Sequence, residues 1–435
     1  MKSPAPSPAS APAPESSPAA PSQQAAPAKV RGLPAAFRGL AWSNLAAQSA
    51  EQISLAAVPM VAVLALGAGP GDIGLLAAVQ SLPFLLLSIP AGLLVDRWSR
   101  RRLMMAAEAL RALSLLALLL ASVSGHLSIG LLALLGFIGA TGTVGFSVAA
   151  PAWVPALVPR ELLVAANGRL ELARSVAFAG GPALAGALVA WAGAAPAFVL
   201  AAMLSAMAVL CVWRLPEPAR SPPTERHVLT ELRDGARLVW QHPLLRAIAF
   251  TSVAWNLAWF VLQAVYVPYA VRQLGMDAQA VGLSLACYGG GMIAGAMLAP
   301  RVMAALPYGQ AVILGPLMSV LGIGAMVATL AWPSALLAML SYVLFGVGPM
   351  VWTIAQTTLR QTVTPNAMLG RVSAIFLTVN MGARPLGAAL GGAVGAGLGE
   401  GAALWLSAAL FVLQLGLIVF SPMRHLQVLP RPVNA

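Results

Sequence analysis

Long apolar runs separated by short polar connections make up most of the chain from about residue 39 onward. Each run has roughly 20 or more residues, the length that an α-helix needs to cross a lipid bilayer. A polar stretch in the middle of the chain divides the runs into two sets of six. The pattern therefore predicts twelve transmembrane helices, at 39–66, 72–94, 103–124, 127–150, 168–192, 195–214, 246–271, 279–303, 308–331, 334–357, 371–397 and 402–421.

The polar segments complete a division of the chain into five parts. Residues 1–37 are rich in Pro, Ala and Ser and can bury little apolar surface, so we expect a disordered cytoplasmic tail. The connection 215–245 has apolar residues at helical spacing between Leu229 and Trp240, which predicts a cytoplasmic linker with an amphipathic helix. We expect six-helix bundles at 38–214 and 246–422, and a cytoplasmic tail at 423–435.

The composition indicates an integral membrane protein. Hydrophobic residues account for 59% of the chain and charged residues for only 9%, against about 25% charged residues in a soluble domain. The net charge of +12 does not indicate a nucleic-acid partner, because the basic residues are scattered between apolar runs. Cys211 and Cys287 lie inside apolar runs and are expected to be small buried residues. We expect no metal and no cofactor.

The distribution of basic residues predicts the orientation in the membrane. Arginines and lysines lie in both tails, in the central connection and in the even-numbered connections between predicted helices. Arg272 is the only arginine or lysine in an odd-numbered connection. Short loops that carry Lys and Arg stay in the cytoplasm, so both termini and the central connection are predicted to be cytoplasmic.

One short connection carries a motif. The residues Gly92-Leu93-Leu94-Val95-Asp96-Arg97-Trp98-Ser99-Arg100-Arg101-Arg102 join the second and third predicted helices. They resemble the G-x-L-x-D-R-x-x-R-R motif of the major facilitator superfamily, whose fold is two pseudo-symmetric six-helix bundles. The resemblance implies a gating loop at Gly92, Asp96, Arg97 and Arg101, in which Asp96, Arg97 and Arg101 latch the second helix against the eleventh in the outward-open state. Arginines that only fix topology are the alternative.

The two halves of the chain repeat each other, as in transporters that rock about a site at the bilayer midplane. Asn167-Gly168-Arg169 in the first half corresponds to Leu369-Gly370-Arg371 in the second, and Asn44 and Glu51 correspond to Asn256 and Gln263. The run from Pro151 to Leu162 is similar to the junction of helices 4 and 5 in the branch that contains the enterobactin exporter and macrolide efflux pumps. Two features depart from drug/proton antiporters of the superfamily. No basic residue lies in 129–155, and the second copy of the loop motif, 295–301, lacks its acid.

Glu51 is the most informative single residue. It lies near the middle of the first predicted helix, where an ionised carboxylate costs at least a few kcal/mol. Asn44 and Gln48 share its helix face. We predict that this face lines a central cavity and that Glu51 is the proton-coupling carboxylate. A structural acid that is hydrogen-bonded to a neighbouring helix is the alternative.

Other polar and aromatic residues at helical spacing are candidates for the same cavity. Packing against lipid or neighbouring helices explains the aromatic residues equally well, and Tyr266 and Tyr269 are alternatively part of an interfacial belt. Arg384 is an intramembrane arginine, expected to contact an anion or Glu51, or to support a broken helix. The cavity candidates beyond the first helix are Trp255, Asn256, Trp259, Gln263, Trp352, Gln356 and Arg384.

Prolines and glycines suggest a hinge. Gly181, Pro182, Gly186 and Pro385 lie inside long apolar runs, where proline bends a helix and small residues allow close sliding contact. Two pairs of opposite charges, Glu108 with Arg111 and Glu171 with Arg174, have the three-residue spacing of intrahelical ion pairs and are expected to be structural.

These features predict a transporter, not an enzyme. The leading hypothesis is proton-coupled efflux of a small amphipathic molecule, of drug or siderophore type, by a monomer that spans the lipid bilayer of the bacterial inner membrane. The chain has no G-x-x-x-x-G-K-[ST] motif, so it does not bind ATP through one. A metabolite importer or facilitator and a non-transporting scaffold or receptor are the alternatives.

Overall fold

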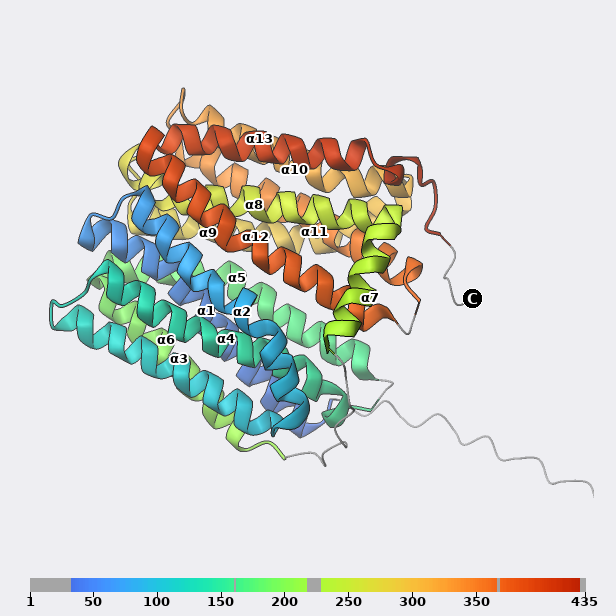
Figure 1. The fold of residues 1–435 in the computed structure, drawn as a ribbon. Coiled ribbons are helices and arrows are strands. Elements are labelled where there is room, and N and C mark those ends of the chain that lie inside the picture. Colours follow the sequence, from blue (N-terminus) through green and yellow to red (C-terminus); the bar gives the residue numbers. More distant parts are fainter. Residues whose placement is uncertain (1–32, 160–161, 217–227, 366–367, 431–435) are drawn as a thin grey trace, which may run out of the picture.

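The computed structural model describes residues 33–159, 162–216, 228–365 and 368–430. These residues form α-helices almost throughout, with no strand among them, and a short 3-10 helix at Pro422–His425. Figure 1 shows the helices running side by side, with α7 lying across one end. The helices are α1 (Ala35–Leu66), α2 (Pro70–Arg97), α3 (Arg100–Val123), α4 (Ile129–Leu157), α5 (Leu163–Ala192), α6 (Ala194–Trp213), α7 (Val228–Gln241), α8 (Pro243–Arg272), α9 (Ala278–Ala305), α10 (Tyr308–Ala328), α11 (Ala335–Val363), α12 (Leu369–Leu398) and α13 (Glu400–Val419).

Twelve of these helices match the twelve predicted spans. Among the described residues, eleven helices are long and apolar enough to cross a membrane. The twelfth, α12, has 30 residues but is less apolar, because Asn380, Arg384 and several glycines interrupt it. The remaining helix, α7, lies within the predicted linker. The structure thus confirms the all-α membrane fold.

Short caps end the helices at equivalent places in the two halves. Gly193 joins α5 to α6 with φ 75°, and Gly399 joins α12 to α13 with φ 87°. Ser128 and Ser334 cap the N-termini of α4 and α11 by accepting a hydrogen bond from a backbone N–H three residues on. The two residues of each pair are 206 positions apart in the sequence. The internal repeat of the sequence is therefore also present in the structure.

Helix contacts follow the same repeat. In the first half, α1 packs on α5 and α6, while α4 packs on α2 and α3, and α3 also on α6. In the second half, α8 packs on α12 and α13, while α11 packs on α9 and α10, and α10 also on α13. We call α1–α6 the first bundle and α8–α13 the second bundle. α7 packs on α12 and α8 and so belongs with the second bundle.

Two seams join the bundles, α2 against α12 and α5 against α9. Glycines allow backbone contact there. A Cβ atom built on Gly74 would lie 2.4 Å from the Cα of Gly392, and one built on Gly186 would lie 2.8 Å from the Cα of Gly282. No larger residue fits at such an approach without moving a backbone.

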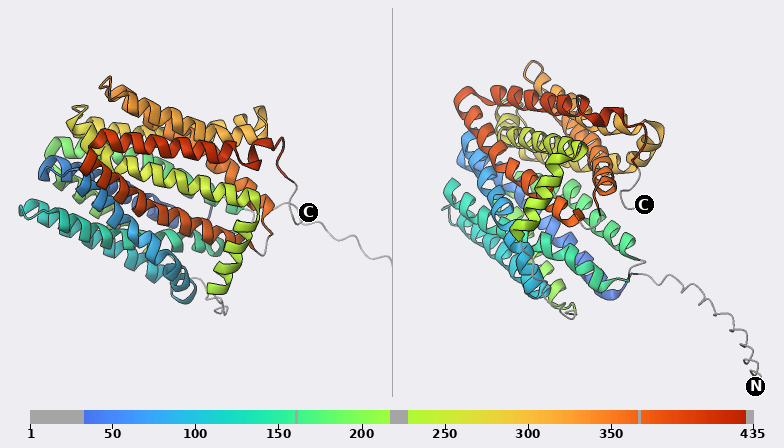
Figure 2. Two further views of the ribbon diagram at one scale, coloured as in Figure 1. Left: turned by 45° about the horizontal axis from the view of Figure 1, so that its top comes forward. Right: turned by 45° about the vertical axis from the view of Figure 1, so that its right-hand side comes forward.

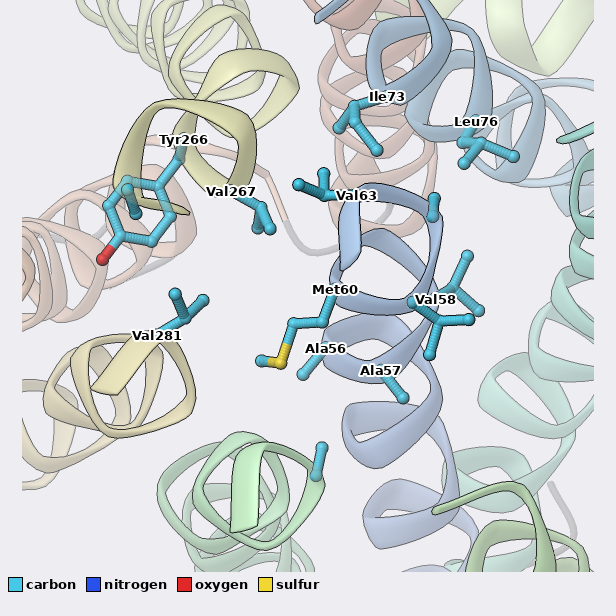
Figure 3. Packing of buried hydrophobic residues seen from close by; sticks show 14 of the residues in the cluster. Ala56, Ala57, Val58, Met60, Val63, Ile73, Leu76, Tyr266, Val267 and Val281 are labelled. Carbon is cyan, nitrogen blue, oxygen red and sulfur yellow. The ribbon is translucent and has the colours of Figure 1, made fainter. Parts of the chain in front are cut away.

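Both ends of the described chain, together with α7, lie at one end of the bundles (Figures 1 and 2). We call this the termini end, and the other the far end. At the far end the bundles share one hydrophobic core, in which Met60 of α1 faces Val267 of α8 and Val281 of α9 (Figure 3). At the termini end each bundle has its own core, one around Trp153 and one around Leu359. The bundles are therefore joined by apolar packing mainly at the far end.

Candidate substrate site between the bundles

Glu51 lies on α1 between the two bundles. Electrostatic attraction links its carboxylate to Arg111 and Arg174 of the first bundle and to Arg384 of the second. Its side chain is partly exposed, and among the described residues it forms no hydrogen bond and no ion pair. The predicted carboxylate thus lies near arginines of both bundles, with no hydrogen bond to a neighbouring helix among the described residues.

Arg384 faces Glu51 from the middle of α12. Its Nε donates a hydrogen bond to Oδ1 of Asn256 on α8, at 3.3 Å. Its guanidinium lies 5.5 Å from the centre of the Phe260 ring, within the range of cation–π attraction. The amide of Asn256 is oriented in turn, because its Nδ2 donates to the carbonyl oxygen of Ser252 at 3.0 Å. Arg384 has no acidic partner within 4.0 Å among the described residues.

Arg174 reaches the same region from α5. It forms an ion pair with Glu171 at 2.8 Å, with the expected three-residue spacing, and its guanidinium lies 5.6 Å from the centre of the Phe178 ring. Both members of the ion pair are about half exposed, at 40% and 49%. The charge of Arg174 is thus already balanced by a neighbour, which is not so for Arg384.

Aromatic rings form a wall that begins beside Arg174 and continues into the second bundle. Phe178 of α5 contacts Tyr288 of α9, with ring centres 6.3 Å apart, and Tyr288 stacks on Trp259 at 4.9 Å. Trp259 stacks on Trp255, nearly parallel at 5.5 Å, and its edge contacts Tyr342 and Phe345 of α11. The structure brings the predicted Trp255 and Trp259 together. Sequence analysis missed Phe178, Phe260 and Tyr288. The first two follow Arg174 and Asn256 by four residues, a helical spacing that signals a shared face.

The structure places other candidates inside a bundle. Gln263 accepts a hydrogen bond from the Tyr342 hydroxyl at 2.9 Å. Tyr266 and Tyr269 are buried and hydrogen-bonded to Ser284 and Thr329, so they are core residues and the idea of an interfacial belt is wrong. Their hydroxyl groups find partners inside the second bundle and do not need the headgroup region.

Trp352 and Gln356 do not join the aromatic wall. Trp352 packs against Gly315 of α10 and belongs to the separate core of the second bundle at the termini end. Gln356 is buried there and donates to the hydroxyl of Thr357 at 2.9 Å. Helical spacing placed both on one face of α11, but that face meets α10.

On α1, Asn44 and Gln48 differ in environment. Asn44 is buried and its Nδ2 donates to the carbonyl oxygen of Leu170 on α5, at 3.4 Å. Gln48 is partly exposed. Of the polar face predicted for α1, Gln48 and Glu51 are therefore the members open to a ligand.

Arg111 of α3 binds α1 one turn before Glu51. It forms a 2.5 Å ion pair with Glu108 and donates to the carbonyl oxygen of Ala47, one turn before Glu51, at 2.6 Å. Both charged side chains are at most 4% exposed. This pair has the structural arrangement that the sequence predicts.

The predicted hinge residues occupy close contacts. A Cβ on Gly181 would lie 2.5 Å from Cβ of Gln52 on α1, inside the first bundle. Gly186 lies on the seam with α9, and a Cβ on Gly282 would lie 2.5 Å from the carbonyl oxygen of Pro182. Pro385 is buried within α12, next to the contact of Gly387 with α8.

The predicted gating loop is a two-residue turn, Trp98-Ser99, between α2 and α3. The hydroxyl of Ser99 caps α3 by accepting from the backbone N–H of Arg102 at 3.2 Å. Arg101 is partly exposed. The surroundings of Gly92, Asp96 and Arg97 lie outside what the structure describes.

The described residues contain no group of three or more His, Cys, Asp or Glu side chains that could hold a metal ion. The candidate site offers hydrogen bonding, charge and stacking. Two repeated six-helix bundles that meet around charged and aromatic residues in the middle of a membrane define a membrane transporter.

Comparisons with known proteins give the family. Residues 40–388 match the Major Facilitator Superfamily, and the chain belongs to it. The enterobactin exporter EntS of Escherichia coli (strain K12) is 29% identical over 350 residues, 79% of this chain and 82% of the exporter. The enterobactin exporter EntS of Citrobacter koseri is 29% identical over 311 residues, 70% of this chain and 72% of the exporter. The predicted superfamily and branch are thereby confirmed.

Solved structures show the same fold. A bacterial homologue of the iron transporter ferroportin, in its inward-facing state, gives a TM-score of 0.70 at 16% identity and covers 88% of this chain and 98% of its own. A POT family transporter in complex with 5-aminolevulinic acid gives 0.72 at 15% identity and covers 91% and 98%. The family match and the exporter relatives make the chain a multi-pass membrane transporter and not an enzyme.

Proposed function

We propose that the protein is a secondary active exporter that moves a small amphipathic molecule, of drug or siderophore type, out of the cytoplasm in exchange for protons. It works as a monomer in the bilayer of the bacterial inner membrane, with both termini and α7 in the cytoplasm. The arginine distribution supports this orientation, and relatives that are named exporters support the direction of transport.

The observation that carries the proposal is the unpaired carboxylate of Glu51. A carboxylate at this depth is costly unless it has a partner or a function. Glu51 has no hydrogen bond or ion pair among the described residues, yet arginines of both bundles attract it. It can therefore gain and lose a proton as the bundles move, and its charge can bias their arrangement.

The arrangement of the cores supports an inward-facing state for this structure. With the termini in the cytoplasm, the far end is periplasmic, and the shared core closes that end. The separate cores leave the bundles free to part at the cytoplasmic end. In the proposed cycle, the units 38–214 and 246–422 rock about the site, with Gly181, Pro182, Gly186 and Pro385 at the pivots. Gly92, Asp96, Arg97 and Arg101 form the cytoplasmic gate.

The aromatic wall supports a substrate with an aromatic or other flat apolar part. Stacked rings from α5, α8 and α9 offer such a part a surface, and Gln48, Glu51 and Arg384 offer polar groups beside it. Trp255 adds a donor, because its buried Nε1 has no hydrogen-bond partner among the described residues.

The test is transport in inside-out vesicles with an imposed pH gradient. A panel of aromatic antibiotics, dyes and siderophore precursors is first screened for compounds to which the expressed protein gives resistance. We expect the vesicles to accumulate at least one of these compounds when the lumen is acidic. Glu51→Gln is expected to abolish this accumulation by removing the titrating group, while exchange of labelled for unlabelled substrate continues.

Glu400→Gln is the matched control, because Glu400 lies at the far end, at the start of α13. It should transport as the wild type does. Gradient-driven accumulation by Glu51→Gln would disprove the role of Glu51. Uptake in the opposite direction would favour a metabolite importer, and absence of transport of every compound would favour a scaffold or receptor.

A further inference from the structure

Arg272 is the single basic residue that departs from the charge distribution of the chain. It is the last residue of α8 and lies at the far end, opposite to the end where the other arginines gather. In the proposed orientation the far end is the non-cytoplasmic side, where the short loops of membrane proteins generally contain few arginines. The structure gives this exception a partner.

The guanidinium of Arg272 binds the first bundle across the interface. Its Nη2 donates to the carbonyl oxygen of Gly67 at 2.9 Å and to that of Ala68 at 2.7 Å. The donor belongs to the second bundle and both acceptors follow the last turn of α1, about 205 residues earlier. A positive charge at the C-terminus of a helix also interacts favourably with the helix dipole.

The acceptors are held by a fixed turn. Gly67 ends α1 with φ 67°, in the left-handed region, and the N–H of Ala68 donates back to the carbonyl oxygen of Ala62 at 2.9 Å. This is the arrangement in which a helix commonly ends on glycine. It turns the carbonyl groups of Gly67 and Ala68 away from α1 and toward Arg272.

We propose that Arg272 is a gating residue of the transport cycle, a clamp that holds the far end closed in the state seen here and must release before that end opens. The clamp lies beside the shared core, in which Ala68 of the first bundle is buried with Val267 and Ala270 of the second. Rocking of the bundles would separate the ends of α1 and α8 and break both hydrogen bonds. Because the acceptors are backbone carbonyl groups, the clamp needs no acidic partner.

The test measures the opening of the far end directly. Spin labels are placed on cysteines at Ser124 and Ala331, which are exposed at the far end of the first and second bundle, in a variant with Cys211→Ala and Cys287→Ala. Distances are measured by electron spin resonance on the full chain in nanodiscs. Arg272→Gln is expected to shift the population about tenfold toward the longer, open distance, because it removes charge-assisted hydrogen bonds.

Two further variants separate the clamp from a general effect. Arg301→Gln removes an exposed arginine at the termini end of α9 and should leave the distances unchanged. Gly67→Ala keeps Arg272 but strains the left-handed turn, so it should shift the population in the same direction as Arg272→Gln. Unchanged distances in both Arg272→Gln and Gly67→Ala would overturn the proposal. This measurement uses no substrate, so its result is independent of the direction and coupling of transport.

Discussion

Glu108 and Arg111 carry opposite charges inside the first bundle and have little contact with solvent. Arg111 binds Glu108 and the carbonyl oxygen of Ala47, so it fastens α3 to α1 just before Glu51. A buried pair of this kind contributes little compared with apolar residues of similar size, but loss of one partner leaves an uncompensated charge.

Substitution of one member of this pair should therefore cost more than substitution of both. Arg111→Met is expected to destabilise the protein by about 3–5 kcal/mol, because Glu108 is left as an unpaired buried acid. Glu108→Met with Arg111→Met should cost clearly less. Unfolding in a mixed-detergent titration measures both. Equal losses in the single and the double variant would show that the ion pair itself stabilises the bundle.

The sequence supports the prediction of some site residues and not of others. Glu51 and Arg384 stand out because a charge in an apolar run has a large cost, which any stable protein must offset. Trp255 and Trp259 share a helix face by spacing alone. Tyr288 carries no such signal, since its role depends on α9 meeting α5 and α8. The clamp formed by Arg272 likewise depends on a turn 204 residues away.

At the scale of helices, adjacent glycines have different roles. On α9, a Cβ on Gly289 would lie 2.4 Å from the backbone nitrogen of Ala179 on α5, so this glycine sets the approach of two helices from different bundles. Its neighbour Gly290 has open space at the same position. The pair offers a matched comparison within one turn of one helix.

We predict that only one of the two alanine variants impairs transport. Gly289→Ala forces α5 and α9 apart and should reduce transport roughly tenfold, the size of effect that overpacking by 1–3 kcal/mol produces. Gly290→Ala should leave transport unchanged and raise helix stability by about 0.5–1 kcal/mol, because glycine is a poor helix former. Transport activity and melting temperature of both variants test this. A loss of transport in Gly290→Ala would mean that helix flexibility, not seam contact, matters.

The positions of the helices could be predicted from hydropathy, but which helices pack against one another could not. The lengths of the apolar runs predict twelve spans. Gly193 and Ser334 lie at helix ends, where glycine and serine are preferred residues. A helical period shows which residues share a face but not what the face meets. Trp352 therefore packs against α10 and not in the aromatic wall, and Tyr266 lies in the core that the two bundles share.

At the scale of the whole molecule, the distribution of cores determines which motion is possible. One core crosses between the bundles at the far end, and two separate cores hold the helices of each bundle together at the termini end. Rocking about the middle would exchange the open and closed ends without unfolding either bundle. In the proposed alternating-access cycle, the far-end contacts, α2 against α12 included, would break in every turnover.

A covalent link at the far end should therefore stop transport reversibly. A Cβ on Gly71 of α2 would lie 3.3 Å from Cβ of Ala396 on α12, close to the separation of about 3.5–4.5 Å found in disulfides. We predict that Gly71→Cys with Ala396→Cys, in a background of Cys211→Ala and Cys287→Ala, forms a disulfide on mild oxidation. Transport should then be lost and should return after reduction.

Thiol labelling before and after reduction shows whether the bond has formed, and each single cysteine variant controls for the substitutions. Only the double variant should respond to oxidant, because only it can join the bundles. Full transport by a fully oxidised double variant would mean that α2 and α12 stay together throughout the cycle at the far end. In that case the shared core would be a permanent part of the fold, and substrate would have to leave by a path that does not separate the bundles.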